Sequence, residues 1–403
     1  MEDLLFLSHR IPYPPNKGDK VRSYHLLRFL ARHYRVHVGA FIDTPEDWAH
    51  APVLQELCHG ETHWAALNPR WARVKALRGL WRDQSLTYHY YANRGMQRWV
   101  NDLMGRLKVP RILVYSAAPC RFVMHPWSHQ PRCVIDFVDV DSVKWLEYAR
   151  SSRGLMSRIH ARESRTLQEM ERAIASRFAA SLFVSHAEAE LFRQVAPESA
   201  DRVHYWENGV DSEFFNPLEA YPNPYGSGET LVFTGAMDYR PNIQGVVWFA
   251  ERIFSRIRQK SPTARFAIVG ARPDRAVKRL ATQEGIEVVG AVADVRPYLA
   301  HARAAVAPLM IARGVQNKVL EAMAMAKPVI ATPQAMEGIR YHPGLHNWVT
   351  EKPELFAHYA LKLLDPLEGV QKAAEYGQMG RQFILEHYQW ETNLQKVLGI
   401  LEP

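Results

Sequence analysis

The sequence is poor in cysteine and has no long apolar run. Only three cysteines occur in 403 residues, Cys58, Cys120 and Cys133, and their spacing fits neither a disulfide framework nor a zinc site. This cysteine usage is typical of a reducing compartment, so we expect a cytoplasmic protein. No uninterrupted apolar stretch approaches the roughly 18 residues that a membrane-spanning helix needs. The first residues are acidic and precede a short apolar run, which is unlike a secretory signal.

Nucleic-acid signatures are missing as well. The net charge of +8 is compatible with nucleic acid, anionic lipid or a phosphorylated small molecule as a partner. However, the sequence contains no zinc-finger spacing, no basic zipper and no aromatic strand of the RNA-recognition type. We therefore expect no nucleic-acid partner.

Strand-like and helix-like segments alternate along the whole chain. Runs such as 4–8 and 35–42 flank an amphipathic stretch, and after residue 229 the pattern restarts with the runs 230–236 and 265–270. Strands that alternate with helices of ten or more residues predict βαβ units and parallel sheets. We therefore expect an α/β protein of two Rossmann-like, doubly wound domains. No G-x-G-x-x-G follows either opening strand, which argues against a dinucleotide-dependent dehydrogenase.

The domain boundaries are predicted from composition. We expect an N-terminal domain at 1–210, joined by a C-terminal helix at 385–403, then a linker at 211–229 and a C-terminal domain at 230–384. The linker is rich in proline and glycine, which suits a stiff connection with turns. Two such sheets facing each other leave a cleft at the carboxyl ends of their strands, where open α/β folds bind ligands.

The stretch GVQNKVLEAMAMAKPVIAT at 314–332 combines a glycine turn with a short helix. Free N–H groups at the positive end of a helix dipole form an anion site, and Gly314 permits close backbone approach. Lys318 adds a charge for phosphate. Glu321 can accept hydrogen bonds from paired hydroxyls such as those of a ribose, while the helix buries Val319, Leu320 and Met323. The alternative is an ordinary surface Lys–Glu pair, which contributes only about 0–1 kcal/mol.

Several phrases resemble family-4 glycosyltransferases of the GT-B fold. The stretch KVLEAMAMAKPVIAT with the following EGI is similar to their nucleotide-sugar-binding segment, and further similar phrases are SHAEAELF, ENGVD, FTGAMDYRPN and VGAVADVRPYLA. The N-terminal SHRIPYPPNKGDKVRSYHLLRFLA and DFVDVDSVKW resemble the sugar transferases found with bacterial exosortase (PEP-CTERM) and exopolysaccharide systems. The resemblance covers nearly the whole chain and implies two domains that face each other across a cleft.

The resemblance also implies a donor site. Glu321 matches the glutamate that holds the ribose hydroxyls, and Gly314 to Lys318 match the segment near the diphosphate. Val292 lies in the loop that matches the one holding the base through backbone groups, and Gly18 matches an N-terminal glycine loop near the donor phosphate or sugar. The candidate donor-binding residues are Gly18, Asp19, Gly235, Arg240, Val292, Arg313, Gly314, Lys318 and Glu321.

Two departures from the family pattern affect this site. The family often has a first glutamate where this chain has Arg313, and an arginine cannot accept hydrogen bonds. Either sugar recognition differs here or Arg313 serves the diphosphate. In FTGAMDYRPN, Ala236 and Pro241 stand where the family often has an arginine and a lysine. Arg240 and Lys318 are then the nearest candidates to neutralise the leaving diphosphate.

The candidate catalytic residues are Asp139, Asp141 and Lys144. A histidine that the family carries in this region is not evident in DFVDVDS, and the two aspartates are candidates to replace it. A carboxylate here could act as a base on the acceptor or orient it; the alternative is a strand-end turn with aspartates bound to backbone. The DVD triplet is similar to a manganese motif of another glycosyltransferase fold, but one such triplet is weak evidence, so we expect no metal and no cofactor.

The segment PRWARVKALRGLWRD at 69–83 carries five cations before its first acid. If it is helical, Val74, Leu77 and Trp81 share one face, and the segment could rest on anionic lipid. The alternative is a solvated helix with its tryptophans in the core. Peripheral contact at the inner face of the cytoplasmic membrane would suit a lipid-linked acceptor.

The combined expectation is a retaining, metal-independent glycosyltransferase of the hexosyltransferase type. It would move a sugar from a nucleotide diphosphate sugar to a glycan or polyprenyl-linked acceptor in exopolysaccharide synthesis; retention is implied by the resemblance. One alternative is a nucleotide-sugar epimerase of the same fold. Another is a non-catalytic nucleotide-binding member of a polysaccharide assembly complex.

Overall fold

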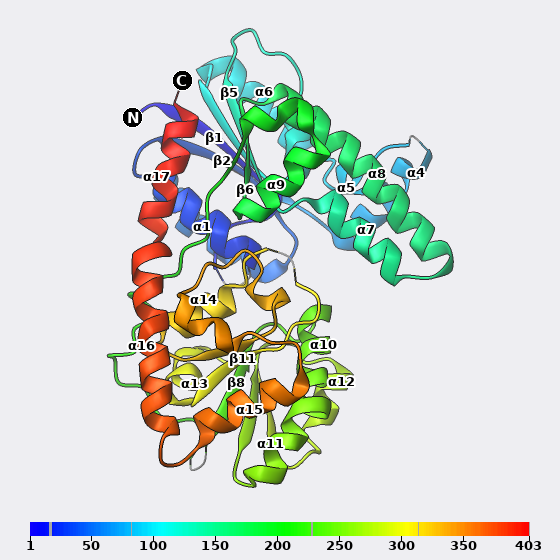
Figure 1. The fold of residues 1–403 in the computed structure, drawn as a ribbon. Helices are drawn as coiled ribbons and strands as arrows, with labels where there is room; N and C mark the ends of the chain where they lie inside the picture. The colour runs from blue at the N-terminus through cyan, green and yellow to red at the C-terminus, as the bar shows by residue number, and fades with distance from the viewer. Residues whose placement is uncertain (16–17, 82, 227–228, 313, 403) are drawn as a thin grey trace. The chain divides into compact units, whose positions relative to one another are not determined.

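The chain forms two compact units, seen in the computed structural model (Figure 1). The structure describes all residues except 16–17, 82, 227–228, 313 and 403. The side chains of residues 81, 346 and 347 also lie outside the described part. The first unit comprises residues 1–207 and 393–403, and the second comprises residues 208–392. Each unit is built around a parallel sheet with its own buried core.

The first unit contains a seven-stranded parallel sheet in the order β3-β2-β1-β4-β5-β6-β7. Leu4, Leu5, Phe6 and Leu7 of the central strand β1 are fully buried, as expected where helices cover both faces of a parallel sheet. The strands are β1 Asp3–Ser8, β2 Arg35–Ile42, β3 His59–Ala66, β4 Arg111–Tyr115, β5 Arg132–Val138, β6 Ala180–Phe183 and β7 Val203–Tyr205.

The helices of the first unit include two that protrude as an antiparallel pair, α7 and α8 (Figure 1). The α-helices are α1 Gly18–Leu30, α2 Ala51–Cys58, α3 Pro69–Ala76, α4 Arg78–Trp81, α5 Leu86–Tyr90, α6 Arg94–Leu107, α7 Asp141–Ser151, α8 Gly154–Arg177 and α9 His186–Val195. Short 3-10 helices cover Pro45–His50, Ala118–Phe122 and Pro197–Arg202. The last helix, α17 Trp390–Leu401, returns to this unit, where the guanidinium of Arg132 donates to Ile400 O at 2.8 Å.

The second unit contains a five-stranded parallel sheet in the order β10-β9-β8-β11-β12. Its strands are β8 Thr230–Thr234, β9 Arg265–Val269, β10 Ile286–Gly290, β11 Ala304–Ala307 and β12 Val329–Ala331. Its helices are α10 Arg240–Phe249, a π-helical turn Ala250–Phe254, α11 Ser255–Lys260, α12 Arg275–Leu280, α13 Arg296–His301, α14 Asn317–Ala324, α15 Pro353–Leu364 and α16 Gly369–His387, with 3-10 turns at Gln334–Met336 and Pro343–Trp348. The prediction of two parallel-sheet α/β domains is confirmed.

The described part of segment 208–229 packs on the second unit. Tyr225 is buried, and its hydroxyl donates to Tyr298 O at 2.8 Å. Val210 pairs with Gln389 as an isolated bridge. Within the described residues, no helix combines the length and the apolar character needed to cross a membrane.

Candidate functional site

The amino end of α14 lies behind a glycine turn. Gly314 has φ of +67°, a conformation that glycine adopts without the steric penalty paid by other residues. The N-cap residue Gln316 makes no side-chain capping hydrogen bond, so its side chain does not satisfy the free N–H groups of the first turn. Val319, Leu320 and Met323 are buried as predicted. The helix thus combines a buried face with an amino end suited to an anion.

Lys318 is half-buried in the first turn of α14. Its Nζ donates to Oδ1 of Asn242 at 2.5 Å and lies 4.7 Å from the centre of the Phe233 ring. Burial lowers the pKa of Lys318 to about 7, although the nearby charge of Glu321 favours the protonated form. The amine therefore has a neutral partner in the free protein and gains from an added negative charge.

Gly235, directly after β8, makes room for this amine. A Cβ at this position would lie 2.9 Å from Nδ2 of Asn242 and 3.1 Å from Nζ of Lys318, and the glycine has φ of +149°. Nδ2 of Asn242 donates to Ala236 O at 2.9 Å. Asn242 therefore links the turn after β8 to α14. Sequence reasoning missed this role, although Asn242 closes the FTGAMDYRPN phrase.

Glu321 follows Lys318 by three residues and is half-buried. Burial raises the pKa of Glu321 to about 7, and the charge of Lys318 opposes the shift. Among the described residues, the carboxylate of Glu321 has no hydrogen-bond or ion-pair partner. The alternative of an ordinary surface Lys–Glu pair does not fit, because both groups are half-buried and Lys318 donates to Asn242 instead. The Glu321 oxygens remain available as acceptors.

Further predicted donor residues lie in the second unit, near the carboxyl ends of its strands. Arg240 is the exposed first residue of α10 and makes no ion pair with another described residue. Val292 is half-buried in the turn after β10 and packs against the core of the second unit. Arg313 lies outside the described residues. Gly235, Val292 and Gly314 follow β8, β10 and β11, so they share the carboxyl edge of the sheet, where α/β folds bind ligands.

In the first unit, Asp139 follows a strained end of β5. Val138 has φ of +73°, and Ser116 at the end of the adjacent strand β4 has φ of +72°. A left-handed β-branched residue is an outlier, and such strain is concentrated at functional sites. The Oδ1 of Asp139 is buried without a partner among the described residues. Burial raises the pKa of Asp139 to about 6, with Lys144 opposing and Asp141 adding to the shift.

Two buried glutamates fix the turn that carries Asp139 and Asp141. Val140 N donates to Oε2 of Glu188 at 2.8 Å, while Ser142 N and Oγ donate to Glu171 at 3.0 and 2.5 Å. Burial raises the pKa of Glu171 to about 8. Sequence reasoning missed both glutamates, because they belong to helices distant in the chain.

Asp141 begins α7, and its Oδ1 lies 3.8 Å from Nζ of Lys144. The three predicted catalytic residues thus lie together on one turn and the first turn of a helix. Their proximity follows from the i, i+3 spacing on a helix and from the strand end that precedes it.

Gly18 and Asp19 open α1. A Cβ at Gly18 would meet no described atom within 4 Å, so packing does not require a glycine there. Asp19 Oδ2 lies 2.6 Å from Nη1 of Arg10 and 3.5 Å from Nε2 of His9. Although burial favours the neutral acid, contacts with His9 and Arg10 hold the pKa of Asp19 well below its usual range. Asp19 therefore orients Arg10 and His9, a relationship that sequence reasoning missed.

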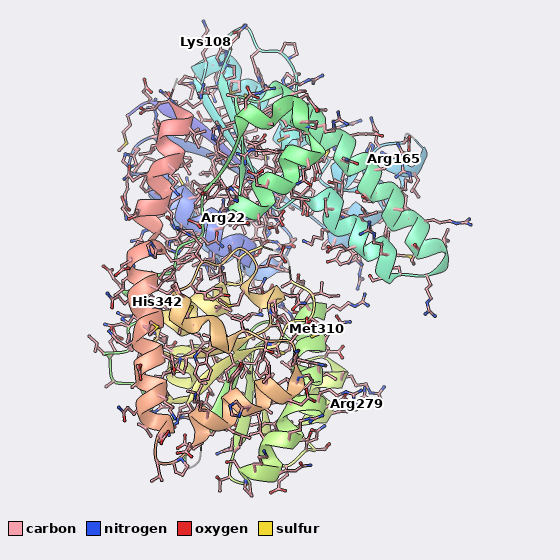
Figure 2. All side chains as sticks on the ribbon, viewed as in Figure 1. Arg22, Lys108, Arg165, Arg279, Met310 and His342 are labelled. Carbon is pink, nitrogen blue, oxygen red and sulfur yellow. The ribbon has the colours of Figure 1, made fainter. Side chains whose placement is uncertain are left out.

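A buried ion pair supports the strand ends of this unit. Nη2 of Arg22 (labelled in Figure 2) lies 3.0 Å from Oδ2 of Asp136, and both side chains are fully buried. Trp206 Nε1 donates to the same carboxylate at 3.0 Å, and the guanidinium lies 3.4 Å from the Trp206 ring centre. Asp136 of β5 thereby links helix α1 to the segment after β7. It lies three residues before Asp139 in the chain.

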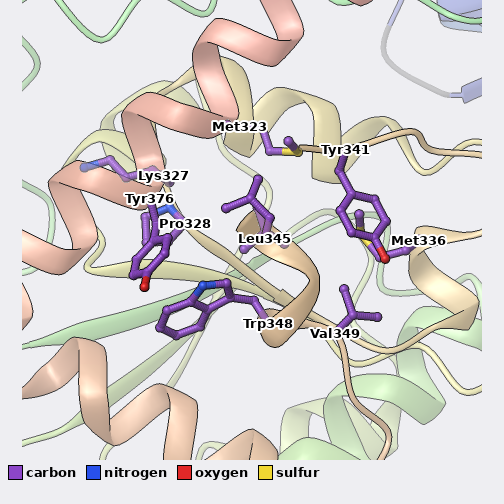
Figure 3. A pocket seen from close by; sticks show the side chains of 11 residues that line it. Met323, Lys327, Pro328, Met336, Tyr341, Leu345, Trp348, Val349 and Tyr376 are labelled. Carbon is purple, nitrogen blue, oxygen red and sulfur yellow. The ribbon is translucent and has the colours of Figure 1, made fainter. Parts of the chain in front are cut away.

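An apolar cavity in the second unit is too small for a nucleotide (Figure 3). Its volume of about 20 Å³ corresponds to about one water molecule. Tyr341, Leu345, Trp348 and Tyr376 are among its lining residues, and Trp348 Nε1 is buried without a partner among the described residues. The cavity therefore has no room for a sugar or nucleotide substrate.

The two parallel-sheet units define the GT-B fold, which known structures share over essentially the whole chain. Sucrose-phosphate synthase from Thermosynechococcus elongatus superposes with a TM-score of 0.68 at 16% identity, over 99% of this chain and 98% of that one. HepE from Anabaena, solved with UDP and glucose, superposes with a TM-score of 0.66 at 14% sequence identity, over 100% of this chain and 99% of that one. WaaG, a glycosyltransferase involved in lipopolysaccharide biosynthesis, superposes with a TM-score of 0.66 at 14% sequence identity, over 99% of each chain. The expected GT-B fold is confirmed.

The sequence adds a family relationship for the second unit. Residues 228–366 match the family model described as glycosyl transferases group 1. No curated protein sequence matches the chain. The matched segment contains Gly235, Arg240, Lys318 and Glu321, so the residues assembled around α14 fall within the region shared with this family.

Proposed function

We propose that the protein is a glycosyltransferase that takes its sugar from a nucleoside diphosphate sugar. One observation carries the proposal: among the described residues, the half-buried Lys318 at the amino end of α14 has the neutral Asn242 as its hydrogen-bond partner, and the carboxylate of Glu321, one turn later, has none. The cation and the free N–H groups suit a diphosphate, and the carboxylate suits a pair of sugar hydroxyls. The match to glycosyl transferases group 1 over residues 228–366 supports this assignment.

Four of the predicted donor residues and the amino end of α14 have a role in this proposal. The first turn of α14 and Lys318 hold the diphosphate, Glu321 holds the ribose, and the turn of Val292 receives the base. Arg240, an exposed cation at the start of α10, neutralises charge on the leaving diphosphate. Cations and helix dipoles aimed at developing negative charge can stabilise a leaving group, so we propose a reaction without metal or cofactor. HepE was solved with UDP and glucose, which makes UDP-sugars the first donors to test.

On the acceptor side, we propose that Asp139 orients the acceptor hydroxyl or accepts its proton. Its Oδ1, buried without a partner among the described residues, and its raised pKa of about 6 suit a group that works near neutral pH. Asp141 and Lys144 complete the polar surroundings.

The biological setting rests on the sequence resemblance. We propose a retaining, family-4 hexosyltransferase that acts on a glycan or polyprenyl-linked acceptor in exopolysaccharide synthesis. It would belong with the PEP-CTERM/exosortase-associated sugar transferases and work in the cytoplasm at the inner face of the membrane.

Calorimetric titration with UDP, GDP and ADP and their sugars tests the donor site. We expect one base series to bind and the Glu321→Ala variant to bind at least tenfold more weakly, a loss of about 1.4 kcal/mol, with an unchanged melting temperature. Glu375→Ala is the control, because Glu375 is exposed on α16 without a partner among the described residues. No heat with any nucleotide would overturn the proposal.

Product analysis separates the alternatives. An isomerised donor formed without any acceptor would identify a nucleotide-sugar epimerase. Tight nucleotide binding without turnover over a panel of acceptors would identify a non-catalytic binding protein.

A further inference from the structure

In the segment of helices α3 and α4, small residues point into the first unit and large apolar residues are exposed to solvent. Ala72, Ala76 and Gly79 are buried where this segment packs against α5. Trp71, Val74 and Leu77 are 66%, 57% and 53% exposed. An ordinary surface helix has the opposite orientation, with its large apolar side chains in the core. The alternative of tryptophans packed in the core is therefore wrong for Trp71.

Further exposed apolar residues lie at the start of α8, the helix that contacts α4. Leu155 and Met156, at the start of α8, are 72% and 52% exposed. Further along α8, Nη2 of Arg162 donates to Gly79 O at 2.7 Å, so α4 and α8 are in direct contact within the first unit (Figure 1). We call the segments 69–80 and 148–162 together the basic-apolar surface.

The charges on the basic-apolar surface all have one sign. Its two segments contain no aspartate or glutamate, and their cations are Arg70, Arg73, Lys75, Arg78, Arg150, Arg153, Arg158 and Arg162. All except Arg162 are exposed, and none of these exposed cations forms an ion pair with another described residue. At the border, Asp83 Oδ1 lies 2.5 Å from Arg165 and 3.5 Å from Arg162, so this carboxylate is already paired.

We propose that the basic-apolar surface docks the protein on an anionic lipid bilayer. Exposed apolar side chains that include a tryptophan can enter the boundary between headgroups and acyl chains, while the surrounding arginines pair with lipid phosphates. The long arginine stems add apolar contact while the charges remain at headgroup level. The surface stands on the first unit alone; its link to a lipid-linked acceptor rests on the proposed function.

Vesicle co-sedimentation of the full chain tests the proposal. The probes are vesicles of phosphatidylcholine mixed with phosphatidylglycerol, and vesicles of phosphatidylcholine alone. We expect at least tenfold stronger binding to the anionic vesicles in dilute buffer, and loss of most of this binding in about 0.5 M salt, where exposed charges are screened within a few ångströms.

Two sets of substitutions assign the binding to the basic-apolar surface. One triple variant removes apolar contacts and combines Trp71→Ser, Val74→Ser and Leu77→Ser. The other reverses charges and combines Arg70→Glu, Arg73→Glu and Arg78→Glu. Each triple variant should bind anionic vesicles at least tenfold more weakly. Matched controls on the second unit are Leu367→Ser with Val370→Ser, both exposed apolar residues, and Arg275→Glu with Arg279→Glu on α12 (Arg279 is labelled in Figure 2). These controls should bind vesicles as the unchanged protein does.

The outcomes are distinguishable from failure of the donor site. Nucleotide titration of the same samples should be unaffected by every variant, and the single Trp71→Ala variant keeps the test available if a triple variant does not fold. Equal binding to neutral vesicles, no binding to anionic vesicles, or binding that the substitutions leave unchanged overturns the proposal. Retention by immobilised polyglutamate but not by vesicles would also overturn it, in favour of an acidic protein partner.

Discussion

Lys318 and Asn242 lie 76 residues apart in the chain, yet Nζ of the lysine donates to Oδ1 of the asparagine at 2.5 Å. An amide positions the amine without neutralising it, whereas a carboxylate would form an ion pair that competes with a diphosphate. Asn242 also donates to Ala236 O, so the turn after β8 and the first turn of α14 are held together before any ligand binds. Such preorganisation reduces the cost of ordering the site on binding.

Binding of a nucleoside diphosphate should take up a proton at pH 8. The pKa of Lys318 in the free protein is lowered to about 7, so most of the amine is neutral at pH 8, and a bound diphosphate raises that pKa. Glu321, with a pKa of about 7, is already mostly ionised at pH 8 and contributes little. Calorimetry in buffers of different ionisation enthalpy measures the uptake. Lys318→Arg should bind without it, because a guanidinium stays charged; equal uptake in both proteins would contradict the assignment.

Gly235→Ala should lower both stability and nucleotide affinity. The added Cβ meets Asn242 and Lys318 at 2.9 and 3.1 Å, and φ of +149° disfavours any L side chain. We expect a loss of about 1–3 kcal/mol, measured from urea unfolding, and at least tenfold weaker UDP binding. Gly105→Ala in α6 is the control: a Cβ there meets no described atom, and alanine in a helix stabilises by about 0.5–1 kcal/mol. A Gly235→Ala protein with unchanged stability and affinity would disprove the close packing.

Asp139→Asn should lower turnover while donor affinity stays constant. The buried carboxyl has a pKa of about 6, so transfer by the unchanged protein should fall as the pH decreases through 6, and this acidic limb should vanish in the variant. Because the folded-state pKa is raised, ionising Asp139 at pH 7 costs stability, and Asp139→Asn should melt no lower than the unchanged protein at that pH.

Asp141→Asn is the companion variant, because Asp141 is more exposed and lies 3.8 Å from Lys144. It should also lower transfer and spare donor affinity. Unchanged turnover in both variants would remove the two aspartates from the mechanism.

Asp136→Asn should destabilise the first unit strongly. The change leaves the fully buried Arg22 without its counter-charge, which typically costs about 3–5 kcal/mol. Glu198→Gln is the matched control, since its partner Arg172 lies 2.8 Å away at the surface and such pairs contribute about 0–1 kcal/mol. Urea unfolding followed by tryptophan fluorescence measures both, and similar losses for the two variants would contradict the role of the buried pair.

The fold can be predicted from the sequence because strands and helices leave patterns in short, contiguous stretches of residues. Two parallel sheets are indicated by strand runs such as 4–8 and 230–236, by helix periodicity and by the restart of the pattern after residue 229. The glycine turn before α14 can also be recognised from the sequence. The phrase FTGAMDYRPN identifies the turn after β8, but it does not reveal that Asn242 binds Lys318.

The details that a sequence cannot show depend on tertiary contacts. Glu171 and Glu188 bind the Asp139 turn from helices far along the chain. The positive φ of Val138 cannot be predicted either, because valine is usually found in extended backbone. For 69–83, helical spacing places Val74 and Leu77 on one face, but only the buried Ala72 and Ala76 reveal that this face is the outer one. Burial and long-range partners therefore limit prediction more than element type does.

Helix α8 connects the basic-apolar surface with the turn that carries Asp139. Glu163 on this helix accepts hydrogen bonds from Ser85, Leu86 and Thr87, at the segment that adjoins α4. Two turns later, Glu171 holds Ser142. Eight residues of helix span about 12 Å. One helix therefore joins the start of α5 to the turn that carries Asp139, by contacts that do not involve the sheet.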